Sequence, residues 1–585
     1  MLNTCKLNVC CLNHSTHDGE ITQYYSSVFF FIFLFIRLVF SIVHSVVVLA
    51  ARPFYSNYKT IGDLDSPLLM PLNGHTLLDE ILALYPLNHI IFVINDEASR
   101  TKKILEARSL TSTRINVIQV SFESLQSGPA STISKLITQK SFSFEHGVLV
   151  LFGDSLIEVD LNFESEVPII IGAKTPNPER YSHFSCDENG KVIEYFDKGV
   201  YPPSQGNLYA EVGGYYLPFL PEPKELSLQE PLSQMADLLK AFPEVRFGQP
   251  SSWVDFGHWD AVASSFYSGK TRSFNKLHIS QNSQYLTKSS SNSSKIREEF
   301  NFLTQIPETL KFHFPRVQLG IDDESYNIEF WPIKSLSEYF VFWNMPNSLW
   351  QKLVNKLVES LEQFSSVVRD PEEIPSDLLF DFYSRRMFDR LENIKGQVEH
   401  LLNQETLFLN GQKLMGFPLL KRKLVEELEK ISKNATYSFV HGDFCFSNIL
   451  IDPSTMTMKF IDPRGSFCGE TLQGDLRYDV AKLRHSYHGL YDFIINDMFS
   501  LKQLGAVDFE LEIILSSNYL DVFKFFDDAL ARFLGNEAHS QVKIIEGTLF
   551  LSMLPLHSDN QDHQIAFTLK ALSILNRELY NADLL

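Results

Sequence analysis

The fold of the carboxy-terminal half of this chain is decided by VHGDFCFSNILID at residues 440–452 and KFID at residues 459–462. The apolar runs in both segments predict strands, and the Asp-Pro-Ser-Thr sequence between them is typical of a turn. A hairpin of this kind brings the loop before its first strand and the end of its second strand to one rim. We therefore expect Asp443, Asn448 and Asp462 to meet at that rim.

These three side chains are the set that phosphoryl transfer needs. A carboxylate must orient or deprotonate the attacking hydroxyl, while an amide oxygen and a second carboxylate hold Mg²⁺ against the nucleotide phosphates. The spacing supplies this set, because Asn448 follows Asp443 after four residues and Asp462 comes fourteen residues later. We assign Asp443 as the catalytic base and Asn448 and Asp462 as magnesium ligands. An ordinary hairpin with polar turn residues is the alternative, and the combined spacing disfavours it.

The same residues resemble the Brenner-type HxDxxxxN motif of the aminoglycoside phosphotransferase and choline kinase family. The resemblance implies a bilobal protein-kinase-like fold that uses ATP, with a small lobe over residues 271–345 and a helical large lobe over residues 346–585. It also implies that Asp479, in the next helix, braces the catalytic loop. A helix amino terminus with favourable dipole charges is the other interpretation of that segment.

In the small lobe, Lys288 ends the strand-like sequence QYLTK and resembles the lysine that binds the nucleotide phosphates. Glu299, on the following helix, is implied as its partner, with the adjacent Glu298 as an alternative; a surface lysine remains the other interpretation. Residues 326–331 resemble the hinge strand whose backbone binds adenine. A glycine-rich phosphate loop is missing, since SQNS occupies residues 280–283.

Beyond residue 346 helices are expected to dominate. Amphipathic periodicity predicts long helices over residues 376–402 and 419–433, and one helix over residues 294–304 of the small lobe.

The amino-terminal region over residues 46–270 alternates short apolar runs with amphipathic helices. This pattern predicts a mostly parallel sheet covered on both faces. The region resembles the sugar-1-phosphate nucleotidyltransferases, which implies a Rossmann-like α/β fold. On this resemblance Asp154 and Asp255 hold one Mg²⁺ against the substrate phosphates, and Lys198 binds the sugar phosphate. The expected strands are 46–50, 90–95, 115–120, 148–152 and 168–173.

One part of this region departs from the family. A glycine-rich loop that binds nucleotide phosphates should follow the first strand. Here the sequence ARPFYSNYK has no glycine until Gly62, and Ser66 or Pro67 stands where a lysine is expected. Arg52 and Lys59 are candidate replacements. The domain is therefore either an active nucleotidyltransferase that uses a second NTP or a degenerate domain kept for binding or assembly.

The composition limits the classes of binding partner and the cell compartment that can be expected. The net charge of −20 disfavours nucleic acid, because an acidic surface repels phosphate backbones. The six cysteines form no CxxC pair, which disfavours a disulfide framework and structural zinc and favours a reducing, cytoplasmic compartment.

Residues 1–45 form a hydrophobic amino-terminal extension. Residues 28–51 are nearly all apolar and long enough to span a membrane. Residues 46–50 also read as the first strand of the next domain, which leaves only 28–45 for a span. A membrane anchor in that segment stays an open alternative.

The fused halves resemble capsule-type proteins of surface polysaccharide biosynthesis. This implies a kinase that phosphorylates a hydroxyl of a small polar molecule, next to a domain that could activate the product. The alternative is a non-catalytic nucleotide-binding scaffold or regulator. The sequence determines neither the acceptor nor the oligomeric state. A cluster of four acidic residues could attract a cationic acceptor or simply form a solvated face. Its members are Glu372, Glu373, Asp377 and Asp381.

Overall fold

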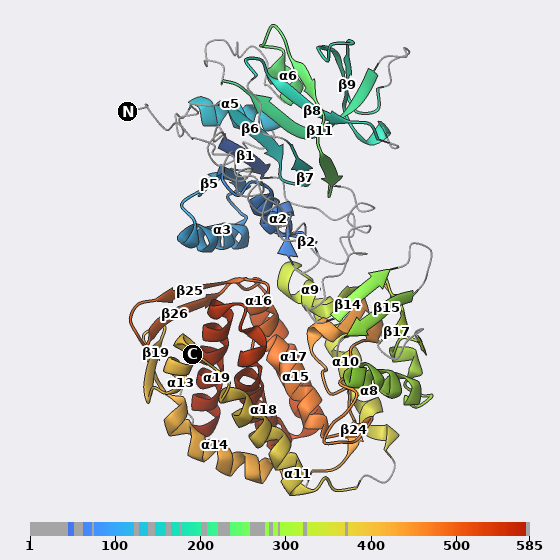
Figure 1. Ribbon diagram of the computed structural model, residues 1–585, viewed down its shortest axis with the longest axis vertical. Coiled ribbons are helices and arrows are strands. Elements are labelled where there is room, and N and C mark those ends of the chain that lie inside the picture. Colours follow the sequence, from blue (N-terminus) through green and yellow to red (C-terminus); the bar gives the residue numbers. More distant parts are fainter. Residues whose placement is uncertain are drawn as a thin grey trace, which may run out of the picture.

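The structure, a computed structural model, consists of an amino-terminal α/β domain and a two-lobed carboxy-terminal part (Figure 1). It describes residues 45–51, 63–72, 75–121, 128–138, 147–159, 165–175, 178–200, 207–219, 234–257, 275–279, 285–290, 293–319, 325–368, 372–433 and 435–580. The apolar segment 28–44, the candidate phosphate-loop residues Arg52 and Lys59, and the segment 280–283 lie outside these ranges.

The amino-terminal domain is built on one mixed sheet with the strand order β10-β9-β11-β6-β1-β4-β5; β8 also pairs with β11, and β12 pairs with β8. The strands β6, β1, β4 and β5 are parallel neighbours. The expectation of a mostly parallel sheet was wrong for the other half, because β11 runs antiparallel to β6, β8 and β9. The strands are β1 (Ser45–Ala50), β4 (His89–Asn95), β5 (Ile115–Val120), β6 (Val148–Phe152), β8 (Ile169–Ala173), β9 (His183–Cys186), β10 (Val192–Phe196), β11 (Asn207–Leu217) and β12 (Arg246–Gly248).

The central position of β1 explains its apolar sequence. It pairs with β4 on one side and β6 on the other, and Val46, Val47 and Val48 are buried. A strand enclosed on both edges and both faces has no polar position to fill. Within the described ranges, no helix combines the length and apolar character needed to cross a membrane. The helices of this domain are α2 (Leu77–Leu84), α3 (Ser99–Thr111), α5 (Gly128–Thr138) and α6 (Met235–Leu239).

The small lobe is an antiparallel sheet in the order β14-β15-β17-β16 with α8 (Ser293–Gln305) beside it. Its strands are β14 (Asn275–Ile279), β15 (Tyr285–Ser290), β16 (Val317–Leu319) and β17 (Ser325–Glu329). A second helix, α9 (Leu336–Phe342), follows and was not predicted. Ser335 caps it by accepting from the Glu338 N–H.

The predicted hairpin is present. The strands β22 (Ile449–Asp452) and β23 (Thr457–Phe460) pair antiparallel, and the short strand β18 (Lys334–Ser335) joins β22. Before the hairpin, a short strand β21 (Ser438–Phe439) pairs with β24 (Gln473–Gly474). Asn448 closes a 3₁₀ turn directly before β22.

The prediction of one long helix over residues 376–402 was wrong. The chain forms α11 (Ser376–Phe380), a π-helical turn (Asp381–Arg385), α12 (Arg386–Leu391) and, after a break, α13 (Gln397–Leu402). The break ends at Gly396, whose φ of 75° an α-helix cannot contain. The predicted helix over residues 419–433 is α14 (Phe417–Ile431).

The remaining large lobe consists of helices around one unpredicted sheet. The sheet has the order β20-β19-β26-β25, from β19 (Thr406–Leu409), β20 (Gln412–Met415), β25 (Phe499–Gln503) and β26 (Asp508–Ile513). The helices are α10 (Asn347–Val367), α15 (Leu476–Tyr487), α16 (Tyr491–Ile495), α17 (Tyr519–Leu534), α18 (Asn536–Met553) and α19 (Gln561–Tyr580).

The helix α3 joins the two halves of the molecule and faces β25 of the large lobe (Figure 1). Arg100 is only 6% exposed and donates from Nη2 to the carbonyl of Val341 at 2.5 Å and from Nη1 to that of Phe342 at 3.4 Å. These carbonyls belong to the last turn of α9, and the last carbonyls of an α-helix have no N–H donor within the helix. Lys103 adds an exposed ion pair with Glu512 at 2.6 Å.

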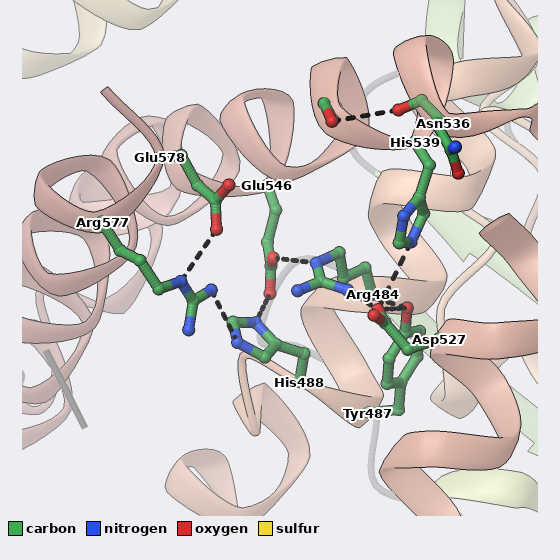
Figure 2. A network of polar contacts seen from close by, with 10 residues as sticks. Arg484, Tyr487, His488, Asp527, Asn536, His539, Glu546, Arg577 and Glu578 are labelled. Atoms are coloured by element: carbon green, nitrogen blue, oxygen red, sulfur yellow. Dashed lines mark hydrogen bonds and ion pairs between the residues drawn. The ribbon is translucent and has the colours of Figure 1, made fainter. Parts of the chain in front are cut away.

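A buried ionic network ties α15, α17, α18 and α19 together (Figure 2). Arg484 is paired with Glu546 at 2.8 Å and also with Asp527. The other carboxylate oxygen of Glu546 accepts from His488 Nδ1 at 2.8 Å, and Arg577 Nη2 donates to His488 Nε2 at 3.0 Å. An imidazole that accepts at Nε2 and donates at Nδ1 is neutral. The network therefore holds His488 uncharged.

Replacing Arg100 with Met should destabilise the contact between the halves by about 1.5–3 kcal/mol, because two helix-terminal carbonyls lose a charged donor. Urea unfolding followed by tryptophan fluorescence measures this loss. Lys103→Met is the control, since exposed ion pairs contribute roughly 0.2–1 kcal/mol. Equal effects of both substitutions would show that Arg100 does not hold the contact.

The network of Figure 2 should make stability depend on pH. Burial lowers the pKa of His488 to about 4, against the effect of Glu546, which raises it. As the pH falls from about 6.5 to 4, the unfolded chain takes up a proton that the folded chain does not, so stability decreases by an amount on the order of a few kcal/mol.

The melting temperature should fall as the pH is lowered across that range. In His488→Gln it should fall less steeply, because the variant lacks the titrating imidazole. His400 is exposed, so His400→Gln is the matched control and should keep the wild-type slope. An unchanged slope in His488→Gln would contradict the role assigned to this imidazole.

Candidate functional site

Lys288 lies at the centre of the first cluster. It is buried on β15 and forms ion pairs with Glu299 of α8 at 2.7 Å and with Asp462, after β23, at 2.8 Å. Tyr326 of β17 donates to the same Glu299 carboxylate at 3.1 Å. The structure thus pairs Lys288 with Glu299, whereas the alternative partner Glu298 is exposed. The two carboxylates raise the pKa of Lys288 in spite of burial, the largest effect, which acts to lower it.

The hairpin brings Asn448 and Asp462 to the same end. The Ile461 N–H donates to the Asn448 carbonyl at 3.0 Å, so the two chain segments are adjacent just beyond the last strand pair. Asn448 Nδ2 donates to the Asp443 carbonyl at 2.9 Å. That bond leaves Oδ1 as the atom of Asn448 suited to a cation. Asp462 has a φ of 55°, a conformation that non-glycine residues adopt rarely and mostly where structure or function requires it.

Asp443 has a partner that was not predicted from the sequence. Lys482, on α15, lies 2.9 Å from Asp443 Oδ1, and its side chain is 16% exposed while that of Asp443 is 41% exposed. Burial acts to raise the pKa of Asp443, but Lys482 and Arg464 hold it well below its usual range. Asp443 is therefore a carboxylate at physiological pH and can accept a hydrogen bond from an alcohol.

Asp479 braces the loop before Asp443, as the resemblance implied. Its carboxylate accepts from the backbone N–H of His441 at 2.6 Å and from that of Gly442 at 2.8 Å. Gly442 has a φ of 78°, and a Cβ there would lie 2.6 Å from the Arg464 Cβ, so glycine is required. Burial raises the pKa of Asp479 to about 7 against the lowering effect of the two backbone bonds.

His441 lies beneath this loop and is fully buried. Its Nδ1 accepts from the Asp443 N–H at 3.3 Å, and burial lowers the pKa of His441 to about 4. A neutral imidazole in this position supports the loop and carries no charge toward Asp443.

Helix periodicity could have indicated the missed residue Lys482. Tyr478, Asp479 and Lys482 are spaced so that they share one face of α15. Asp479 was already expected at the loop, so the residue three positions later was a candidate. Arg464 was also missed; it donates to the Tyr478 hydroxyl at 2.9 Å.

In the amino-terminal domain the structure brings Asp154 and Asp255 together. The strand β13 (Ser252–Asp255) pairs with β7 (Ser155–Glu158), and Asp255 stands opposite Ser155. A Cβ built on Gly257 would lie 3.0 Å from Asp255 Oδ1 and 3.2 Å from Asp154 Oδ2. Asp255 Oδ1 accepts from the Gly257 N–H at 2.7 Å and Asp255 Oδ2 accepts from the Tyr181 hydroxyl at 2.8 Å, so both carboxylates lie beside Gly257.

The other predicted residues of this domain are less closely grouped. Lys198 lies exposed in the turn after β10. Ser66, which stands near the expected lysine position, donates from its hydroxyl to the Ala50 carbonyl at 3.3 Å and caps a short helix. Within the described residues, no group of three or more His, Cys, Asp or Glu side chains is arranged to hold a metal ion by itself. A cation at either site would therefore need oxygens from a bound phosphate or from amides.

No protein-family model and no curated protein matches this chain. Among solved structures, it is similar to a protein from Bacillus anthracis described as a glucose-1-phosphate thymidylyltransferase, in complex with a sucrose. That match has 15% identity and a TM-score of 0.31, and it covers 39% of this chain and 97% of that chain. The structure of HddC from Yersinia pseudotuberculosis matches with 18% identity and a TM-score of 0.29, over 38% of this chain and 97% of that chain.

Proposed function

We propose that the carboxy-terminal half is an ATP- and Mg²⁺-dependent phosphotransferase that phosphorylates a hydroxyl of a small polar molecule. The observation that carries this proposal is the meeting of Lys288, Glu299 and Asp462 next to the hairpin that bears Asn448. Phosphoryl transfer requires a lysine for the nucleotide phosphates and oxygen ligands for magnesium at such a junction.

The residues fit both cofactors. When bound, Mg²⁺–ATP would supply the phosphoryl group and neutralise its charge. Asp462 and the Oδ1 of Asn448 would hold the cation, and Lys288 would bind the phosphates. The backbone of residues 326–331, the end of β17 and the two residues after it, is the proposed adenine contact.

Asp443 acts on the acceptor. Because it remains ionised, it accepts the hydrogen bond of the attacking hydroxyl, orients the oxygen and receives its proton as the bond to phosphorus forms. Lys482 holds the carboxylate in place through its contact with Oδ1. Since phosphoryl transfer proceeds through a loose transition state, orientation matters more than early proton removal.

For the amino-terminal domain, we propose binding of one divalent cation by Asp154 and Asp255 against the phosphates of a nucleotide or sugar phosphate, with Lys198 as a further phosphate contact. The convergence of both carboxylates at Gly257 supports it. The pair of activities would belong to the synthesis of a surface polysaccharide precursor. The alternative is a non-catalytic nucleotide-binding scaffold. Phosphate-transfer assays distinguish the two.

Asp443→Asn should reduce phosphate transfer at least ~10²-fold, because the amide cannot accept the hydroxyl proton. The assay screens polyols, sugars and amino alcohols with radiolabelled ATP. Asp452→Asn, at the turn end of the same hairpin, is the matched control and should retain activity. Wild-type protein that transfers phosphate to no alcohol, or Asp443→Asn with full activity, would remove the proposal.

Lys288→Met should lower kcat/KM for ATP by about tenfold to a hundredfold, the effect of losing a charged contact to phosphate. Lys295→Met is the matched control, because Lys295 pairs with the same Glu299 at 3.6 Å but is 42% exposed. Melting curves of both variants establish that they are folded. Equal losses in the two variants would argue against a phosphate-binding role for Lys288.

A further inference from the structure

A group of cations lies beside Asp443 in a chain whose net charge is −20. Arg386 of α12 and Arg464, after Asp462, lie over the ring of Phe382, at 5.5 Å and 5.3 Å from its centroid. Arg464 also lies 5.5 Å from the ring of Tyr478. Two guanidinium groups on one ring repel each other, so the arrangement has an electrostatic cost unless an anion is bound nearby.

In the described part of the chain, the carboxylates that act on Arg464 are Asp443 and Asp479, which are fewer than the nearby cations Arg386, Arg390, Arg464 and Lys482. Within it, Arg386 has no hydrogen bond or ion pair, and neither Arg464 nor Arg390 has an ion pair with a carboxylate. Arg390 donates to the Ser552 carbonyl at 2.9 Å, and Arg464 donates to the Tyr478 hydroxyl. Asp443 is already paired with Lys482. The positive charge on this face therefore exceeds the negative charge.

The buried hydroxyl of Tyr478 reports the same imbalance. Burial acts to raise the pKa of Tyr478, yet Arg464, Lys482 and Arg386 together lower it below its ordinary value. Burial lowers the pKa of Arg386 to about 10, and Arg464 acts in the same direction, while Asp443 acts in the opposite one. Arg386 therefore remains charged at neutral pH and lies within electrostatic reach of Asp443.

The backbone that carries these residues is irregular. Phe382 belongs to the π-helical turn Asp381–Arg385, which ends directly before Arg386. Turns of this kind are rare and occur frequently at functional sites. The turn thus carries Phe382, whose ring both guanidinium groups lie over.

We infer that this face binds the acceptor through an anionic group, so the substrate is a hydroxyl compound that carries a phosphate or a carboxylate. The inference rests on the proposed phosphotransferase function. Arg386 and Arg464 would bind the anion, in the forked geometry that suits both groups, while Asp443 orients the hydroxyl. Sugar phosphates and sugar acids are the acceptor classes with this chemistry.

The alternative of a cationic acceptor finds no support at this site. Glu372, Glu373 and Asp377 are exposed, and Asp381 is paired with Arg385 at 3.0 Å. This acidic group forms a solvated face and leaves the cations near Asp443 uncompensated.

Matched acceptors test the inference. The purified full chain is assayed for ADP release and labelled product with glucose, glucosamine, glucose 6-phosphate and glucuronate, with the mannose and galactose counterparts, and with glycerol and glycerol 3-phosphate. An anionic member of a set should be preferred over its neutral counterpart by about tenfold or more in kcat/KM. Comparing the phosphate-bearing acceptors with the carboxylate-bearing ones shows which anion is recognised.

The variant Arg386→Gln should lose this preference through a higher KM for the anionic acceptor. Arg385→Gln is the matched control, because its side chain is 70% exposed and next in sequence, and it should keep the preference. Preferred transfer to neutral or cationic acceptors, or an unchanged preference in Arg386→Gln, would overturn the inference and leave the phosphotransferase intact. Transfer to no acceptor would remove both.

Discussion

The ammonium group of Lys288 contacts carboxylates from two other parts of the chain, Glu299 on α8 and Asp462 beyond the catalytic hairpin. A buried lysine needs such partners, because an unpaired charge in the protein interior has a large desolvation cost. The contact therefore sets the position of the small-lobe sheet and of its helix relative to the hairpin. Every role proposed for the phosphates and the metal depends on that position.

The helix α15 controls the other side of the same site. Asp479 holds the loop before Asp443 through two backbone bonds, and Lys482, one turn later, contacts the Asp443 carboxylate itself. One face of α15 thus contacts both the backbone before Asp443 and the Asp443 carboxylate, the group proposed to orient the acceptor. The neighbouring arginines extend this positive region, so the local electrostatics oppose the acidic character of the whole chain. The inferred charge of the acceptor rests on this local field, since contacts of a few ångströms outweigh screened distant charges.

The two halves of the molecule are joined by the docking of α3, whose Arg100 supplies donors to the end of α9. The helix α9 lies directly before the large lobe, so the amino-terminal domain is attached near the junction of the two lobes. In that domain the paired strands β7 and β13 place Asp154 and Asp255 at Gly257, where a side chain would block the space. Each half therefore gathers oxygen ligands by pairing two strands whose ends carry them.

The hairpin residues and five strands of the first domain, β1, β4, β5, β6 and β8, could be predicted, because strand pairing over a short turn and apolar runs are local properties of the sequence. The antiparallel pairing of strands around β11 was not predicted. The pairing of Lys288 with Glu299 over Glu298 depended on helix orientation, and the break of the expected helix over residues 376–402 depended on a π turn and Gly396. The contact of Lys482 with Asp443 and the approach of Arg386 to Arg464 bring together segments distant in sequence. The amino-acid sequence determined which chemical groups the site contains, whereas tertiary packing decided which of them share a charge environment, because electrostatic interaction depends on distance in space.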